Sequence, residues 1–184
     1  MATQTLLNEA QFDALPEEVR DQHELLDGEL VELASALGGH QILVTTLTFS
    51  LHGFFRTSRI GGVIPDVEFA LAADSLLRPD VAVLLGSKWQ TFELWKLPIR
   101  TIPDIAIEIV SPSESAYHVR RKNYIYRESG VAEIWTIYPT LQEVDIDAGK
   151  STRRLSMQDS LSTSLLPGWE LSLVDLFSGL TQLR

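Results

Sequence analysis

Apolar runs in the middle of the chain predict a group of β-strands. Three runs are rich in Val, Ile and Leu: residues 62–71 (GVIPDVEFAL), 79–85 (PDVAVLL) and 104–110 (DIAIEIV). The third run is apolar on both of its faces, which is typical of a strand in the interior of a sheet. Residues 132–139 (AEIWTIYP) and 143–150 (EVDIDAGK) are predicted as further strands.

Two other segments favour helices. The first has apolar residues at near-helical spacing, namely Ile42, Leu43, Leu47, Leu51, Phe54 and Phe55. We therefore predict an amphipathic helix over residues 39–57. A second helix is predicted to begin with Ser111 or Ser113 as its N-cap and to run to about residue 129, where Gly130 ends it.

The remaining segments contain shorter elements. Residues 8–20 (NEAQFDALPEEVR) predict a short helix and a further turn from Pro16, and residues 87–103 predict a loop with some local structure. The Asp27-Gly28 pair lies between two apolar arms, which is a strong signal for a tight β-hairpin. Residues 164–177 predict a last strand and a short helix. This order of elements predicts an α/β or α+β domain, with helices flanking one central sheet.

Composition narrows the class of protein. The 184 residues are expected to form a single domain over 1–184, and 45% of them are apolar. No apolar run approaches the roughly 18 residues of a membrane span, and the first 20 residues lack the pattern of a signal peptide. The chain has no cysteine, which excludes disulfides and thiolate metal sites and favours a cytoplasmic location.

Charge is distributed unevenly along the chain. The net charge is −10, but residues 1–32 hold nine acidic residues against one basic residue, for a net −8, so the other residues carry only −2. Residues 118–127 hold four of the fifteen Lys and Arg residues. We expect an acidic N-terminal arm, 1–32, packed on or leading into a nearly neutral core. The bulk charge therefore does not exclude a nucleic-acid partner.

Two acidic residues occupy unusual places in the predicted strands. Glu108 interrupts a strand that is otherwise apolar, where an ionised carboxylate is costly unless it is paired or metal-bound. Asp80 opens the run 79–85. If the two strands are neighbours, Asp80 and Glu108 converge, and two carboxylates completed by waters and a substrate phosphate suit magnesium.

A lysine joins them from the following helix. Helical spacing places Lys122 on the apolar, inward stripe with Val119, Ile125 and Tyr126. Its ammonium could orient the attacking water or neutralise charge on a phosphate.

Each of these residues also has a structural interpretation. Glu108 could be salt-bridged or exposed at an edge, Asp80 could be a turn residue after Pro79, and the Lys122 amine could reach solvent. The dipeptide Pro-Asp occurs three times in the chain, so it is a weak motif alone. It is the coincidence of the three residues that favours a site.

Several longer stretches resemble one known family. LLDGELVE, RPDVAVL, PDIAIEIVSPS, VRRKNYIYRESGVAEIW and LLPGWELSL occur in the order and spacing of the Uma-type restriction endonuclease family, long catalogued as a domain of unknown function. That family belongs to the PD-(D/E)XK nuclease superfamily, and the resemblance covers roughly residues 10–180. It implies a restriction-endonuclease-like core with a mixed central sheet flanked by helices, and a magnesium-dependent (or manganese-dependent) site.

The resemblance also implies roles for individual residues. Asp80 and Glu108 match the two metal-binding acids. The superfamily's lysine position holds Val110, but members of this family carry the lysine on the next helix, where Lys122 matches it.

Two further positions match the family as auxiliary site residues. They are Glu29, after the Asp-Gly turn, and His40, which opens the long helix. Glu29 could equally be a solvated hairpin acid, and His40 could cap or pack. The chain departs from the family at Tyr138, where relatives usually have an aspartate; Trp135 is interpreted as core.

Three functions remain open at this point. The first is a metal-dependent endonuclease that hydrolyses DNA phosphodiester bonds through Asp80, Glu108 and Lys122. The second is a catalytically silent nuclease-fold module that binds a protein or nucleic-acid partner, because fold alone does not determine function. A weaker third is a nuclease acting on RNA or small nucleotides. A homodimer is expected if both strands of DNA are cut, and no membrane partner is expected.

Overall fold

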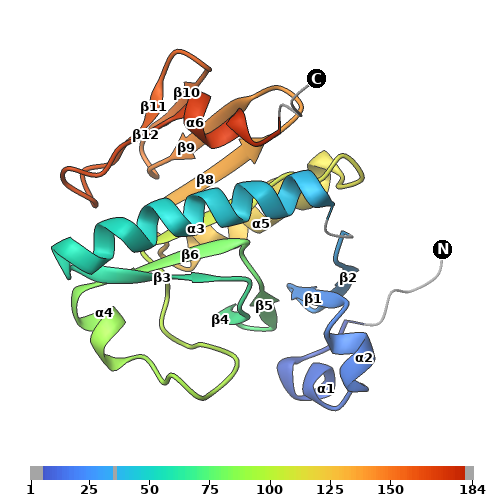
Figure 1. Ribbon diagram of the computed structural model, residues 1–184. Helices are drawn as coiled ribbons and strands as arrows, with labels where there is room; N and C mark the ends of the chain where they lie inside the picture. The colour runs from blue at the N-terminus through green and yellow to red at the C-terminus, as the bar shows by residue number, and fades with distance from the viewer. Residues whose placement is uncertain (1–5, 35–36, 181–184) are drawn as a thin grey trace.

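A mixed six-stranded sheet forms the centre of the protein (Figure 1). The computed structural model describes residues 6–34 and 37–180. The sheet has the order β10-β9-β8-β7-β6-β3. Its strands are β3 (Gly61–Pro65), β6 (Val81–Leu85), β7 (Ile105–Ile109), β8 (Glu133–Tyr138), β9 (Glu143–Asp147) and β10 (Thr152–Leu155). Only the β7–β8 pair is parallel. The predicted fold class, a mixed sheet flanked by helices, is confirmed.

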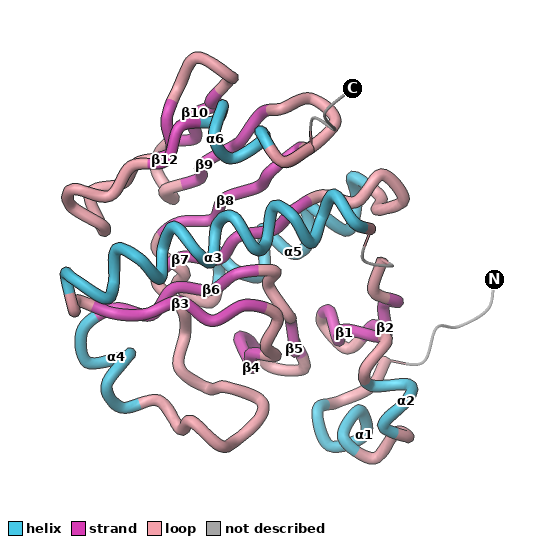
Figure 2. The backbone as a smooth tube through the Cα atoms, in the orientation of Figure 1, coloured by secondary structure: helices cyan, strands magenta, loops and turns pink. Residues whose placement is uncertain are grey.

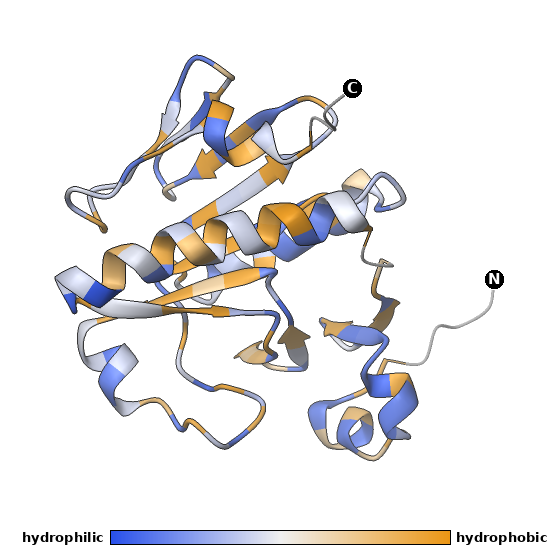
Figure 3. Cartoon of the chain, viewed as in Figure 1, coloured by the Kyte–Doolittle hydropathy of each residue, from blue (hydrophilic) through white to orange (hydrophobic). Residues whose placement is uncertain are grey.

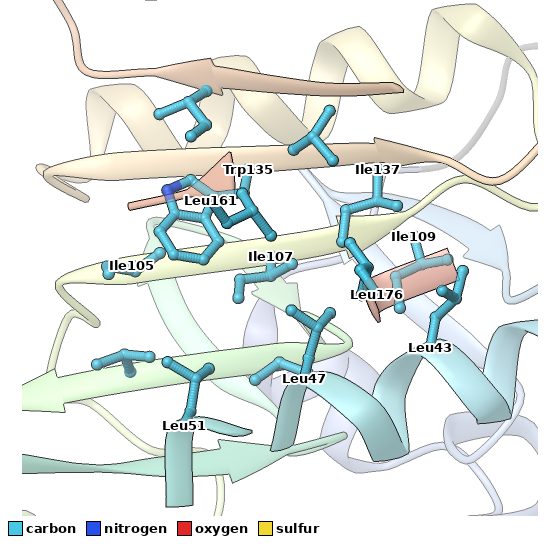
Figure 4. Close-up of a cluster of buried hydrophobic side chains, with 14 of the residues drawn as sticks. Leu43, Leu47, Leu51, Ile105, Ile107, Ile109, Trp135, Ile137, Leu161 and Leu176 are labelled. Carbon is cyan, nitrogen blue, oxygen red and sulfur yellow. The ribbon is translucent and has the colours of Figure 1, made fainter. Parts of the chain in front are cut away.

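The two long helices cover opposite faces of this sheet. Helix α3 (Gly38–Ser58) crosses its front in the view of Figure 1, and α5 (Ala116–Glu128) lies behind it. Figure 4 shows Leu43, Leu47 and Leu51 of α3 directed toward the isoleucines of β7. Ala106, on the other face of β7, packs instead against Ile125 of α5. The predicted two-sided burial of this strand is therefore confirmed, and Glu108 shares the face of Ala106.

A second, four-stranded sheet has the order β2-β1-β5-β4. It contains β1 (His23–Leu26), β2 (Glu29–Glu32), β4 (Phe69–Ala72) and β5 (Ser75–Leu77). The predicted hairpin is confirmed: β1 and β2 are joined by Asp27 and Gly28, both at positive φ (48° and 83°), as the tight hairpin turn requires.

The acidic N-terminal segment is folded against the rest of the protein. Its helices α1 (Glu9–Asp13) and α2 (Glu17–Arg20) are mostly hydrophilic, as the blue colouring of Figure 3 shows. Phe12 of α1 is nevertheless buried with Leu25 and Leu76. The chain from residue 6 to 32 is thus held by apolar contacts, and its carboxylates are brought close to other side chains.

Two local predictions are wrong. Residues 62–71 are not one strand, because the chain turns at Asp66 (φ 50°) and sends β3 and β4 into different sheets. The local structure predicted within residues 87–103 is the short helix α4 (Gly86–Thr91). The N-cap of α5 is Ser115, whose hydroxyl accepts from the His118 N–H. Ser111 and Ser113 lie in the turn before the helix, where their hydroxyls bond to each other.

The C-terminal segment closes one end of the core. It contains β11 (Ser160–Leu161), β12 (Leu171–Ser172) and α6 (Leu173–Ser178), so the predicted last strand and short helix are confirmed. Trp135 is fully buried, as predicted, and its ring stacks on Trp169 at 5.6 Å between centroids. Figure 2 shows α6 beside β9 and β10, away from the N-terminal helices. Among the helices that the structure describes, none is both long and apolar enough to cross a membrane.

Candidate functional site

The inward face of α5 carries a buried lysine. Val119, Lys122, Ile125 and Tyr126 are the buried residues of this helix, as their spacing predicted. Lys122 is only 6% exposed, so its amine does not reach solvent. A buried ammonium is unstable without acidic partners. The Lys122 ammonium has two, Glu24 and Glu108.

The ammonium of Lys122 joins two separate sheets. Its Nζ lies 2.7 Å from Oε2 of Glu108 on β7 and 3.2 Å from Oε2 of Glu24 on β1. The hydroxyl of Tyr126, one turn along α5, donates to the other oxygen of Glu108. Glu24 also accepts a hydrogen bond from the backbone N–H of Arg78. Glu108, the strand acid that interrupts β7, is therefore paired and hydrogen-bonded on both oxygens.

The pKa values of Glu108 and Lys122 are both raised, although burial and neighbouring charge act in opposite directions on each group. Burial raises the pKa of Glu108 to about 8, although the nearby Lys122 ammonium opposes the rise. Burial alone would lower the pKa of Lys122, but Glu108 and Glu24 raise it by more, so its net pKa is raised. Lys122 is therefore a permanent cation at neutral pH. It can stabilise negative charge but cannot act as a general base there.

Asp80 reaches the same place from the neighbouring strand. Strands β6 and β7 run antiparallel with Val81 opposite Ile107, so Asp80, one residue before β6, comes beside the end of β7. The backbone N–H of Ile109 donates to its Oδ2 at 2.6 Å. The negative charge of Asp80 contributes to the raised pKa of Glu108, which reflects this proximity.

His40 contacts Asp80 directly. Its Nε2 lies 2.9 Å from Oδ1 of Asp80. This hydrogen bond raises the pKa of His40, against the lowering effect of burial. The other ring nitrogen, Nδ1, is buried without a hydrogen-bond partner among the described residues. The imidazole thus has one nitrogen on Asp80 and one available for a further contact.

Glu29 lies at the cavity wall but is held by another residue. Its carboxylate pairs with the guanidinium of Arg121, which also contacts Asp27 and the carbonyl of Leu26. The arrangement ties the β1–β2 hairpin to α5. The structure therefore brings His40, Asp80, Glu108 and Lys122 together and places Glu29 at the edge of the group.

A cavity of about 1000 Å³ opens over these side chains. Glu24, His40, Asp80, Glu108 and Lys122 all line it. This volume lies at the upper end of the range for ligand sites, so a nucleotide-sized group has room. No three His, Asp or Glu side chains within residues 6–34 and 37–180 form a group that could hold a metal ion. The protein offers two carboxylates instead, those of Asp80 and Glu108, whose hard oxygens suit magnesium when waters and a phosphate supply the remaining ligands.

Glu24 and Tyr126 are site residues that the sequence did not single out for chemistry. Tyr126 was on the inward stripe of α5, but its hydrogen bond to Glu108 needed the strand beneath it. Glu24 alternates with Leu26 on one face of β1, and Leu26 packs beneath α5. That alternation was the available signal: an acid sharing a buried face two residues from a core leucine.

The Glu108 pKa predicts a pH-dependent stability. The pKa of Glu108 is raised to about 8 in the folded protein, against about 4.3 in the unfolded chain. The contribution of Glu108 to the unfolding free energy is therefore fully present below about pH 4.3 and is lost as the pH rises through about 8. Between these values the unfolding free energy of the wild-type protein should fall by up to about 1.4 kcal/mol per pH unit more than that of the Glu108→Gln protein.

Urea denaturation at pH 5, 6, 7 and 8 in EDTA measures this difference. Glu143→Gln, which removes a half-buried acid of β9, is the control and should follow the wild-type slope. Parallel pH profiles for wild-type and Glu108→Gln would contradict the prediction.

Comparison with known proteins identifies the family. The profile of the Uma2 family, described as putative restriction endonuclease, matches residues 9–181. The chain belongs to the Uma2 family. The fold of this Uma2 chain resembles the crystal structure of a putative nuclease belonging to DUF820 from Anabaena variabilis, with a TM-score of 0.81. The two sequences are 22% identical, and the match covers 95% of this chain and 99% of the other. No curated protein matches this Uma2 chain significantly.

Family membership and fold together make the chain nuclease-like. The family match includes both strands and the helix that carry Asp80, Glu108 and Lys122. In this Uma2 chain Val110, two residues after Glu108, donates its backbone N–H to the carbonyl oxygen of Ile137 on β8. The ammonium beside Glu108 is that of Lys122 on α5.

Proposed function

We propose that the protein is a divalent-metal-dependent endonuclease that hydrolyses phosphodiester bonds of DNA. The observation that carries the proposal is the buried Lys122 ammonium, held beside Glu108 in the cavity that Asp80 also lines. A buried ammonium among acidic side chains is costly for stability, so this group of residues is more readily explained by chemistry than by folding.

Asp80 and Glu108 are the residues that would hold the metal ion. A bound Mg²⁺ or Mn²⁺ supplies a polarised phosphate and an activated water. For Glu108 to act as a ligand it must lose the proton that its raised pKa favours. The backbone N–H of Ile109 and the His40 ring fix the orientation of the Asp80 carboxylate.

Lys122 has the role of a fixed positive charge. Its raised pKa keeps it protonated, so it stabilises the negative charge that develops on the phosphate rather than accepting a proton from water. Glu24 and Glu108 hold the ammonium in place before substrate arrives. A preorganised charge of this kind needs no rearrangement during the reaction.

Cleavage of plasmid DNA tests the proposal. The purified protein should convert supercoiled plasmid to nicked or linear forms in Mg²⁺ or Mn²⁺, and EDTA should stop the conversion. An RNA of the same length is tested in parallel. Cleavage of the RNA and not of the DNA would identify RNA as the substrate. If neither DNA nor RNA is cleaved with Mg²⁺ or Mn²⁺, the enzyme proposal is wrong.

The charge pattern supports a second candidate, a silent module that binds a partner. The net charge is −10, which weakens the non-specific grip on phosphates that nucleases use. Calorimetric titration of Mg²⁺ and Mn²⁺ separates the two candidates, since only an enzyme needs the ion. Metal binding that the Glu108→Ala protein lacks favours the enzyme. The homodimer and the cytoplasmic location stay predictions.

A further inference from the structure

The outer face of α5 carries two exposed tyrosines with an arginine between them. Tyr117 is 66% exposed, Tyr124 is 58% exposed, and Arg120 is also exposed. The spacing of three and four residues places all three on one side of the helix. That side is opposite the buried stripe containing Lys122. We call these three residues the Tyr-Arg-Tyr stripe.

Arg120 differs from the other basic residues of the helix. Arg121 pairs with Asp27 and Glu29, Lys122 with Glu24 and Glu108, and Arg127 with Asp147; these pairs join α5 to its surroundings. Arg120 makes no ion pair or hydrogen bond with any residue in the described parts of the chain. Its charge is therefore available to an anionic partner.

The stripe begins at the rim of the cavity. The ring of Tyr117 lies 5.6 Å from the ring of His118, and His118 lines the cavity together with Lys122. From there the stripe runs along α5 for seven residues, which is about 10 Å at the rise of an α-helix. A chain-like ligand on the stripe would therefore lead into the site.

We propose that the Tyr-Arg-Tyr stripe binds an unpaired segment of a DNA strand, with bases stacked on Tyr117 and Tyr124 and a phosphate on Arg120. That the ligand is a nucleic acid rests on the proposed function. Stacking requires the face of a base, which is accessible in an unpaired strand and covered within a duplex. Stacking also needs few positive charges, so it fits a protein whose net charge is −10.

Fluorescence anisotropy with a labelled 20-nucleotide single strand tests the stripe. In EDTA, where the proposed cleavage stops, the wild-type protein should bind the single strand at least about tenfold more tightly than the matching duplex. Tyr117→Ala and Tyr124→Ala should each weaken single-strand binding about tenfold, and the phenylalanine variants should retain it, because stacking needs the ring rather than the hydroxyl. Arg120→Gln should lower the salt dependence of single-strand binding by about one released counterion.

Phe49→Ala is the matched control. Phe49 is 80% exposed but lies on α3, on the other face of the sheet. Its removal should leave single-strand binding unchanged. Unaltered binding by the Tyr117→Ala/Tyr124→Ala double variant, a preference for duplex, or no binding by wild type would overturn the proposal and leave the stripe as a surface for another class of partner.

The stripe and the proposed function fail independently. Plasmid cleavage with wild-type kinetics by the double variant, together with unaltered single-strand binding, would remove the stripe and keep the enzyme. Binding that depends on the two tyrosines in a wild-type protein that cuts nothing would keep the stripe and remove the enzyme.

Discussion

The Asp80→Asn protein should cleave DNA on the order of 10³-fold more slowly than wild type. The substitution keeps the shape of the side chain but removes the negative charge, and the single amide oxygen can accept from only one of Ile109 and His40. A metal ligand contributes several kcal/mol to stabilisation of the transition state, and each 1.4 kcal/mol is worth a factor of ten in rate. Initial rates of plasmid nicking in Mg²⁺ measure the loss.

The chain supplies a matched control for this variant. Asp104 also follows a proline, but it precedes β7, at the opposite end of the same antiparallel strand pair. Its carboxylate binds Lys88 and the N–H of Leu85, and it does not line the cavity. Asp104→Asn should therefore nick DNA at nearly the wild-type rate, with some loss of stability. Equal rates for Asp80→Asn and Asp104→Asn would contradict the assignment.

The Lys122→Met protein should lose about 3 kcal/mol of unfolding free energy as well as its activity. Methionine fills similar space but leaves the buried acidic groups of Glu24 and Glu108 without the cation that each of them contacts. Removal of one partner from a buried ionic group is far more costly than removal of the whole group. Urea denaturation in EDTA at pH 8 measures the loss.

A triple variant separates stability from catalysis. Lys122→Met combined with Glu24→Gln and Glu108→Gln removes every charge of the buried group and should recover most of the lost stability, while cleavage stays absent. Lys150→Met, at an exposed lysine, is the control and should change the unfolding free energy by less than about 0.5 kcal/mol. A triple variant no more stable than Lys122→Met would show that packing, not charge, causes the loss.

Much of the candidate site follows from local periodicity. Strand alternation places Glu108 with Ala106, away from the three isoleucines, and helical spacing places Lys122 on the inward stripe of α5. Both are properties of a few consecutive residues. The sequence could therefore predict them without knowledge of the neighbouring chain, and the structure agrees at each position.

Other features depended on segments far apart in the chain. Glu24 reaches Lys122 only because the β1–β2 hairpin packs beneath α5, through the contact of Leu26 with Ile125 and Tyr126. The same packing engages Glu29 with Arg121 and so removes it from the centre of the site. The break of residues 62–71 at Asp66 likewise became visible only when the two halves entered different sheets.

The sequence by itself determined the type of the main elements, the two-sided burial of β7 and the identity of the acids and the lysine. These follow from the periods of strands and helices, which act within one element. The tertiary structure decided how the charges are paired: Lys122 lies between two acidic side chains, Asp80 contacts His40, and Arg120 has no ion pair among the described residues. Ion pairs depend on distances between elements, and the packing of those elements fixes the distances only when the chain has folded.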